Sequence, residues 1–143
     1  MDRFLGTWCL ERSEMFDEYL TARGVPWLIR KMMQASWITK VFEKVDDATY
    51  SLTNKSPMST ILWKFQFGQT FEGKGFDGKM HKITFDIKDN QLLETHVRVE
   101  DAQRQDHAET YRYDRQDDYV ILNLQHEQIN AKRFFKKQPD GTA

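Results

Sequence analysis

The sequence predicts an all-β protein, a ten-stranded antiparallel up-and-down β-barrel or β-clamshell, with a helix-turn-helix lid between the first and second strands. Short alternating runs of apolar and polar residues are separated by turn residues about every ten positions, which is typical of a sandwich or barrel. Helical periodicity is confined to one long segment, Ser13–Ser36. The later links are short, so neighbouring runs should pair antiparallel, and closure of the sheet would remove its edges.

Ten runs are interpreted as strands because their side chains alternate and turn residues bound them. In chain order they are Phe4–Glu11, Trp37–Val45, Thr49–Thr53, Thr60–Phe67, Thr70–Glu72, His81–Lys88, Gln91–Glu100, Ala108–Asp114, Tyr119–His126 and Ile129–Lys137. A barrel of this many strands is wide enough to leave an interior cavity.

The helical segment divides into two short helices, and together they form a lid over residues 14–36. Ser13 is interpreted as the N-cap of the first helix, which ends at Gly24. Pro26 suits the first turn of the second helix, where its missing N–H costs nothing. A helical pair inserted once into an all-β chain is expected to cover the open end of the barrel.

Length and composition indicate one domain, residues 1–143, with a flexible tail at 138–143. The chain has 21 Lys and Arg against 22 Asp and Glu, scattered rather than clustered, which argues against nucleic acid as a partner. Its one cysteine, Cys9, excludes an internal disulfide framework. The chain starts directly with the first strand and has no apolar run of membrane-spanning length, so we expect a cytoplasmic protein.

No residue pattern indicates an enzyme, a metal site or a cofactor site. The histidines at positions 81, 96, 107 and 126 stand apart, with no spacing typical of metal ligands. Nucleophile, Walker and dinucleotide motifs are missing as well. We therefore predict a non-enzymatic protein without a cofactor.

Alternation places an arginine on the inner face of the barrel. In the last strand, Arg133 shares a face with Phe135, and in an earlier strand Tyr113 and Arg115 point inward. A buried guanidinium needs an anion, and no interior carboxylate is evident on the neighbouring strands, so a ligand anion is the expected partner. The alternative is that a bulge shifts the alternation and leaves Arg133 on the surface.

Several motifs resemble the intracellular fatty acid-binding proteins of the calycin superfamily, and the resemblance runs from residue 4 to residue 137. These motifs are FLGTW at 4–8, FDEYL at 16–20, Gly24, GQTF at 68–71 and RFF at 133–135. The longer match FDEYLTARG at 16–24, with HKITFD at 81–86, ETH at 94–96 and KKQ at 136–138, resembles the nematode branch. The combination is specific, although each motif alone is weak.

The resemblance implies a ligand carboxylate held by an arginine on the last strand, a tyrosine two residues later and a second arginine on an earlier strand. Arg133 matches the first arginine, whereas Phe135 occupies the tyrosine position and Tyr113 that of the second arginine. The Tyr113 hydroxyl is a candidate replacement for the lost one, and Arg115 a candidate second charge. Retinol-binding relatives have glutamine at the arginine positions, so Arg133 favours an acid over an alcohol.

We therefore expect a monomeric carrier that binds a long-chain fatty acid in an internal cavity and transports it. The ligand tail and its portal are assigned to five side chains: Phe16, Met33, Met58, Phe76 and Phe135. The basic side of the second helix, Arg30 and Lys31, suggests transient contact with anionic membranes.

Four alternatives stay open at this point. The barrel is a protein-interaction module filled by its own aromatic side chains; it binds a retinoid acid or another acyl lipid; it is a hydrolase or isomerase, for which no acid–base pair is found; or it is secreted after removal of a leader.

Overall fold

The computed structural model describes residues 1–101 and 108–139. The helices are the 3-10 helices η1 (Asp2–Phe4) and η2 (Val99–Asp101), with the α-helices α1 (Phe16–Ala22) and α2 (Trp27–Ala35). The strands are β1 (Gly6–Glu14), β2 (Thr39–Lys44), β3 (Tyr50–Lys55), β4 (Thr60–Phe65), β5 (Phe71–Lys74), β6 (Met80–Lys88), β7 (Gln91–Arg98), β8 (Glu109–Gln116), β9 (Tyr119–His126) and β10 (Ile129–Lys137).

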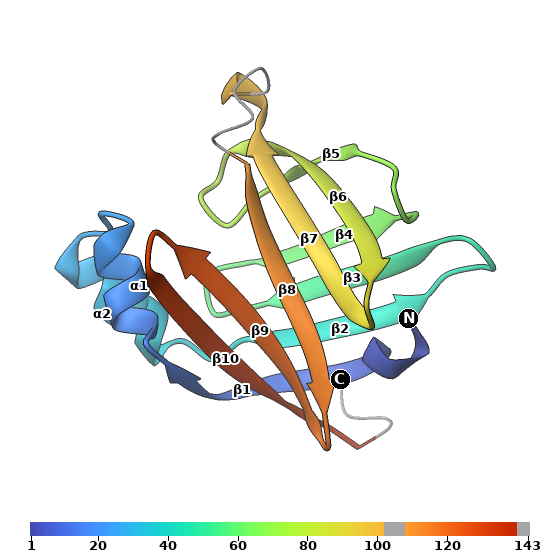
Figure 1. Ribbon diagram of the computed structural model, residues 1–143, viewed down its shortest axis with the longest axis horizontal. Coiled ribbons are helices and arrows are strands. Elements are labelled where there is room, and N and C mark those ends of the chain that lie inside the picture. Colours follow the sequence, from blue (N-terminus) through green and yellow to red (C-terminus); the bar gives the residue numbers. More distant parts are fainter. Residues whose placement is uncertain (102–107, 140–143) are drawn as a thin grey trace.

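The ten strands form one antiparallel sheet that curls into a nearly closed barrel, as predicted (Figure 1). Their order is β4-β3-β2-β1-β10-β9-β8-β7-β6-β5, so the first and last strands of the chain pair with each other. The strands β4 and β5 are the two ends of this order and share no backbone ladder. The barrel therefore has one seam, between β4 and β5.

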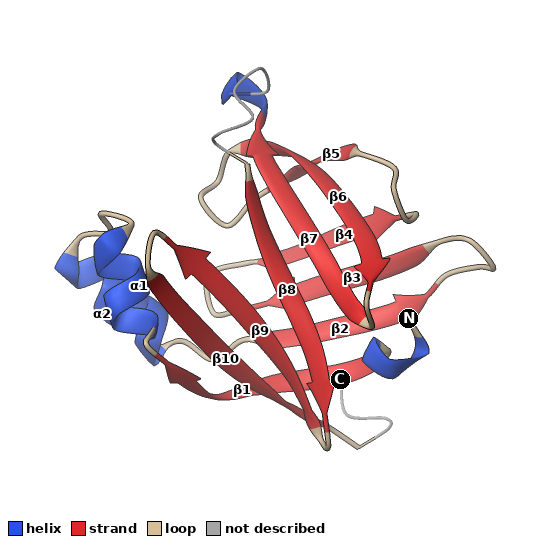
Figure 2. Cartoon of the chain, viewed as in Figure 1, coloured by secondary structure: helices blue, strands red, loops and turns tan. Residues whose placement is uncertain are grey.

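The lid lies at one end of the barrel, away from the N-terminal η1 helix (Figure 2). Helix α1 packs on β10 and β9, and α2 packs on α1. Arg23, at the end of α1, forms an ion pair with Glu109 of β8. Gly24 ends α1 with φ of +80°, and its N–H donates to Thr21 while that of Val25 donates to Leu20. This is the glycine-terminated helix end that the sequence predicts.

The prediction for the start of the lid was wrong. Ser13 does not cap a helix, because β1 continues to Glu14 and Met15, in the left-handed region at φ 59°, is the N-cap of α1. The reason is a bulge in β1, where the pairing with β10 shifts between Leu10 and Arg12. Leu10 stands opposite Phe135, but after the bulge Ser13 stands opposite Arg133. The extra residue therefore turns the Ser13 side chain toward the same inner face.

Candidate ligand-binding site

Five buried polar side chains share the inner faces of their strands with core residues. They are Lys40 of β2, Asn54 of β3, Glu94 and His96 of β7, and Arg133 of β10. Four of them lie two residues from a buried apolar side chain on the same strand, for example Phe42 beside Lys40 and Leu92 beside Glu94, and His96 lies two residues from Glu94. The barrel interior is thus apolar with a few charged groups, a composition typical of small-molecule sites.

Arg133 lies inside the barrel at the lid end and is 6% exposed. Its Nε donates to Ser13 Oγ at 3.0 Å, and its guanidinium lies 3.8 Å from the centre of the Phe16 ring. Burial lowers the pKa of Arg133 to about 10. Among the described residues no carboxylate forms an ion pair with it. An anion next to this guanidinium would offset the cost of its burial.

Arg133 also lines a groove of about 520 Å³ between the end of β1, the start of α1 and the segment that follows α2. Phe16 and Trp37 line the same groove, and Trp37 is more than half exposed. The guanidinium therefore lies where the barrel interior meets the base of the lid.

Phe135 is buried beside Arg133 and has no hydroxyl to offer a ligand. Tyr113 is buried too, but its hydroxyl donates to Glu94 Oε1 at 2.7 Å. Burial and the neighbouring Glu94 charge raise the pKa of Tyr113 well above its usual value. In this structure the Tyr113 hydroxyl is therefore directed at a carboxylate of the protein itself.

Arg115 lies at the other end of the barrel, beside η1. Its guanidinium is 5.1 Å from the centre of a Trp8 ring, and it donates to the Arg3 carbonyl at 3.4 Å. Its buried Nε has no partner among the described residues. The structure thus does not bring Arg115 to the lid end, where Arg133 contacts Phe16.

The expectation that the neighbouring strands lack an interior carboxylate was wrong for β8, because its neighbour β7 provides Glu94. Glu94 is 2% exposed and accepts hydrogen bonds from Tyr113 and, at 2.5 Å, from His96 Nε2. Burial opposes its ionised form, but the His96 hydrogen bond and the charges of His96 and Lys40 outweigh burial, so the pKa of Glu94 is lowered. The signal was present in the sequence, because Leu92, Glu94 and His96 alternate onto one face of β7.

Lys40 was also not predicted as an interior residue, although alternation places it on the same face of its strand as Phe42. Its Nζ donates to Asn54 Oδ1 at 2.7 Å across the β2–β3 pair. Burial lowers the pKa of Lys40 to about 8; the Glu94 charge opposes this shift, and the Arg133 charge adds to it.

The sequence suggested that all four histidines stand apart, but two of them are in contact. His81 and His96 face each other through their Nδ1 atoms at 3.0 Å, and His81 Nε2 lies 2.9 Å from Asp77. Hydrogen bonds lower the pKa of Asp77 and of Glu94, the two carboxylates beside the pair, despite their burial. His107 lies outside the described residues.

The five residues assigned to the tail and portal separate into two groups. Phe16 and Phe135 are buried against the interior, whereas Met33, Met58 and Phe76 are exposed on α2, the β3–β4 turn and the β5–β6 turn. Phe76 nevertheless approaches Trp63, with ring centres 6.1 Å apart.

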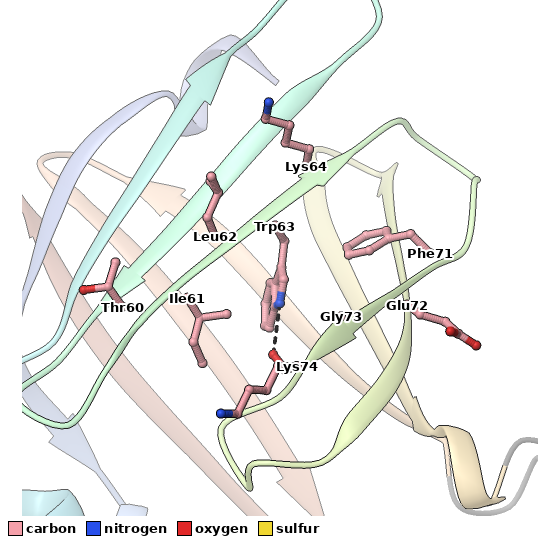
Figure 3. A pocket seen from close by; sticks show the side chains of 9 residues that line it. All are labelled: Thr60, Ile61, Leu62, Trp63, Lys64, Phe71, Glu72, Gly73 and Lys74. Atoms are coloured by element: carbon pink, nitrogen blue, oxygen red, sulfur yellow. Dashed lines mark hydrogen bonds between the residues drawn. The ribbon is translucent and has the colours of Figure 1, made fainter.

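A groove of about 430 Å³ follows the seam between β4 and β5 (Figure 3). Trp63 crosses the seam, and its Nε1 donates to the Lys74 carbonyl at 3.1 Å (Figure 3). Gly73 lies beneath the Trp63 ring, where an added Cβ would lie only 3.0 Å from the indole. Side chains rather than a backbone ladder therefore close the barrel here.

Within residues 1–101 and 108–139, no group of three potential metal ligands is close enough to hold an ion. The described helices include none that is long and apolar enough to cross a membrane.

The chain is similar to fatty acid-binding proteins in sequence and in fold. Fatty acid-binding protein homolog 3 of Caenorhabditis elegans is 38% identical over 138 residues, which cover 95% of this chain and 82% of the relative. A fatty acid-binding protein homolog of Ascaris suum is 38% identical over 142 residues, 96% of this chain and 85% of the relative. The solved structure of As-p18, an extracellular fatty acid binding protein, superposes with a TM-score of 0.90 at 38% identity, covering 96% and 97% of the two chains. No protein-family model matches the chain.

Proposed function

The chain belongs to the fatty acid-binding protein family, and we propose that it is a non-enzymatic carrier that binds a long-chain fatty acid inside its barrel and transports it. One observation carries the proposal for this chain: Arg133 is buried in the barrel without a carboxylate partner among the described residues. A fatty acid provides both the missing anion and an apolar chain for the interior. The ligand carboxylate would take the Arg133 N–H groups that Ser13 leaves free.

The energetics favour such a ligand. Burial of a methylene contributes about 0.8 kcal/mol, so a long acyl chain gives on the order of 10 kcal/mol before ordering costs. A charge-assisted hydrogen bond adds roughly 1.5–3 kcal/mol. The acyl chain would therefore set most of the affinity, and Arg133 would set the preference for an acid.

Arg133 is the residue on which the head-group proposal rests. Tyr113 would join it by redirecting its hydroxyl from Glu94, and Arg115 would need to reach the lid end from its position beside Trp8. Phe16 and Phe135 would line the acyl chain, and Met33, Met58 and Phe76 would border its entry.

Oleate binding to the purified, delipidated protein tests the function. A ligand that binds only the folded state must raise the melting temperature, and the shift should grow with oleate concentration. Mass spectrometry of lipids extracted from native protein would then identify the natural ligand. It would also distinguish a fatty acid from a retinoid acid or another acyl lipid. The absence of any shift with oleate would favour the barrel filled by side chains such as Trp63, Phe65 and Phe85, whose rings already pack together.

The exposed helix α2 supports a further proposal, transient contact with anionic membranes during transfer. None of its residues is buried, and Trp27 and Leu28 are each more than 60% exposed. Of its two basic residues, Arg30 is paired with Asp17 at 3.1 Å, so Lys31 would provide the free charge. An apolar face with a cation beside it suits the surface of an anionic bilayer.

The proposal treats the chain as a single lipid-binding domain that is monomeric and cytoplasmic, with secretion as the alternative because As-p18 is extracellular. Light scattering after gel filtration tests the monomer, and immunolocalisation in the source tissue tests the compartment.

A further inference from the structure

The side-chain amide of Asn54 has an unused hydrogen-bond donor inside the barrel. Asn54 is 2% exposed, and its Nδ2 is buried without a partner among the described residues. Its Oδ1 accepts from Lys40 Nζ at 2.7 Å, which fixes the direction of the amide. A buried N–H group without an acceptor is costly, so a second acceptor is expected beside it.

Lys40 adds further donors at the same place. An ammonium has three N–H groups, and only the bond to Asn54 is formed with the described residues. The Lys40 Nζ lies 5.5 Å from the ring centres of Tyr113 and Phe135, and 5.8 Å from that of Phe76. Lys40 and Asn54 thus direct several N–H groups into an otherwise aromatic part of the interior.

The positive charge of Lys40 is already balanced in part by a carboxylate of the protein. Glu94 favours the charged form of Lys40 through space, although the two do not form an ion pair within 4.0 Å. The missing group is therefore an oxygen acceptor without a full negative charge. Since Phe135 lies beside Lys40 and follows Arg133 on the same inner face of β10, the acceptor would lie along the acyl chain rather than at its head.

We propose that the site formed by Lys40 and Asn54 binds a hydroxyl or keto oxygen on the acyl chain, so that the preferred ligands are hydroxy or oxo fatty acids. The inference rests on the proposed function, in which Arg133 holds the carboxylate. An unsubstituted chain would place methylenes against the Asn54 donor and leave it unpaired, whereas an oxygen there accepts from Asn54 Nδ2 and Lys40 Nζ. A trapped water molecule is the competing occupant, and it predicts no preference among acyl chains.

The test compares stearic acid with 7-, 9-, 10- and 12-hydroxystearic acid, each displacing a fluorescent fatty acid from delipidated protein. The best isomer should bind about 5-fold more tightly than stearic acid, the worth of one neutral hydrogen bond. Asn54→Leu and Lys40→Met should reduce that preference to within about 2-fold. Asn130→Leu, the same change on the outer face of β10, should keep it.

Asn54→Asp keeps an oxygen that accepts from Lys40 but removes both N–H groups of the Asn54 amide. It therefore tests the role of the amide donor even if Asn54→Leu does not fold. The proposal is overturned if no hydroxystearate binds more tightly than stearic acid, or if the preference survives in both Asn54 variants. Failure of the proposed function would look different, because then stearic acid and every hydroxystearate would fail to displace the probe.

Discussion

Arg133 Nε donates to Ser13 Oγ at 3.0 Å. This hydrogen bond joins the last strand, β10, to the first strand, β1, at the residue before β1 ends. The side chains meet because the β1 bulge turns Ser13 inward. The bond uses one donor of the guanidinium, and the others remain for a ligand carboxylate.

The first prediction concerns this guanidinium. Arg133→Gln should weaken oleate binding by about 1.5–3 kcal/mol and oleyl alcohol binding much less, because only oleate carries the anion. Calorimetric titration of both ligands with both proteins gives a cycle whose coupling energy isolates the arginine–carboxylate interaction. Arg115→Gln is the matched control and should give a coupling energy near zero. A zero coupling at Arg133, or a large one at Arg115, would contradict the assignment.

The second prediction concerns Lys40, whose pKa in the folded protein is about 8, against an ordinary value of 10.5. Burial of the charged Lys40 therefore destabilises the fold, and the whole of this cost is present below about pH 8. Between pH 8 and 10.5 the unfolded chain binds the proton more tightly, so the free energy of unfolding should rise with pH. The difference of 2.5 pKa units corresponds to about 3 kcal/mol as an upper limit.

Urea unfolding of the wild type and Lys40→Met from pH 7 to pH 10 checks this. Lys40→Met should be the more stable protein at pH 7, and its advantage should shrink as the pH rises. An advantage that does not depend on pH would mean that Lys40 is not held in a destabilised charged form.

The third prediction concerns the seam at β4 and β5. Gly73→Ala places a Cβ within 3.0 Å of the Trp63 indole and should displace it from the Lys74 carbonyl. Overpacking of this kind costs about 1–3 kcal/mol, and the tryptophan emission should shift to longer wavelength as the indole becomes hydrated. Glu72→Ala, next to it but exposed, should change neither the stability nor the emission. An unchanged emission in Gly73→Ala would show that another part of the seam, and not the Trp63 indole, moves to accommodate the added Cβ.

The fourth prediction concerns transfer from α2. Lys31→Glu should slow the transfer of a fluorescent fatty acid to vesicles containing anionic lipid, because each charge near such a surface contributes about 1 kcal/mol. Transfer to neutral vesicles should not change. Lys132→Glu, on the exposed face of β10, is the control and should leave both transfer rates unchanged. Rates that respond to neither the anionic lipid nor Lys31→Glu would exclude an electrostatic docking step.

Arg30→Glu differs from Lys31→Glu because Arg30 also holds Asp17, whose pKa is lowered by hydrogen bonds from Gln34 and Arg30. Its effect on transfer should therefore be accompanied by a loosened contact between α1 and α2. Hydrogen exchange of the α1 amides separates the two effects, since Lys31→Glu should leave that exchange unchanged.

The sequence by itself determined the strands, the lid and the direction of several side chains. Alternation is a local property of an extended chain, so Tyr119–His126 and Ile129–Lys137 were predicted with the bounds that the structure has. The same alternation placed Arg133 and Tyr113 inside the barrel, where both are buried. Gly24 was recognisable because few other residues adopt a positive φ at a helix end.

Only the tertiary structure decided which inward side chains meet. Lys40 and Asn54 are opposite each other in the β2–β3 pair, whereas Glu94 comes from β7, far along the chain, so curvature of the sheet rather than sequence spacing sets its distance from them. The bulge in β1 depends on pairing with β10, so the position of Ser13 was not readable from local pattern. Tyr113 bonds Glu94 on the neighbouring strand β7, and Arg133 bonds Ser13 on its paired strand β1, so strand pairing and register decided these partners.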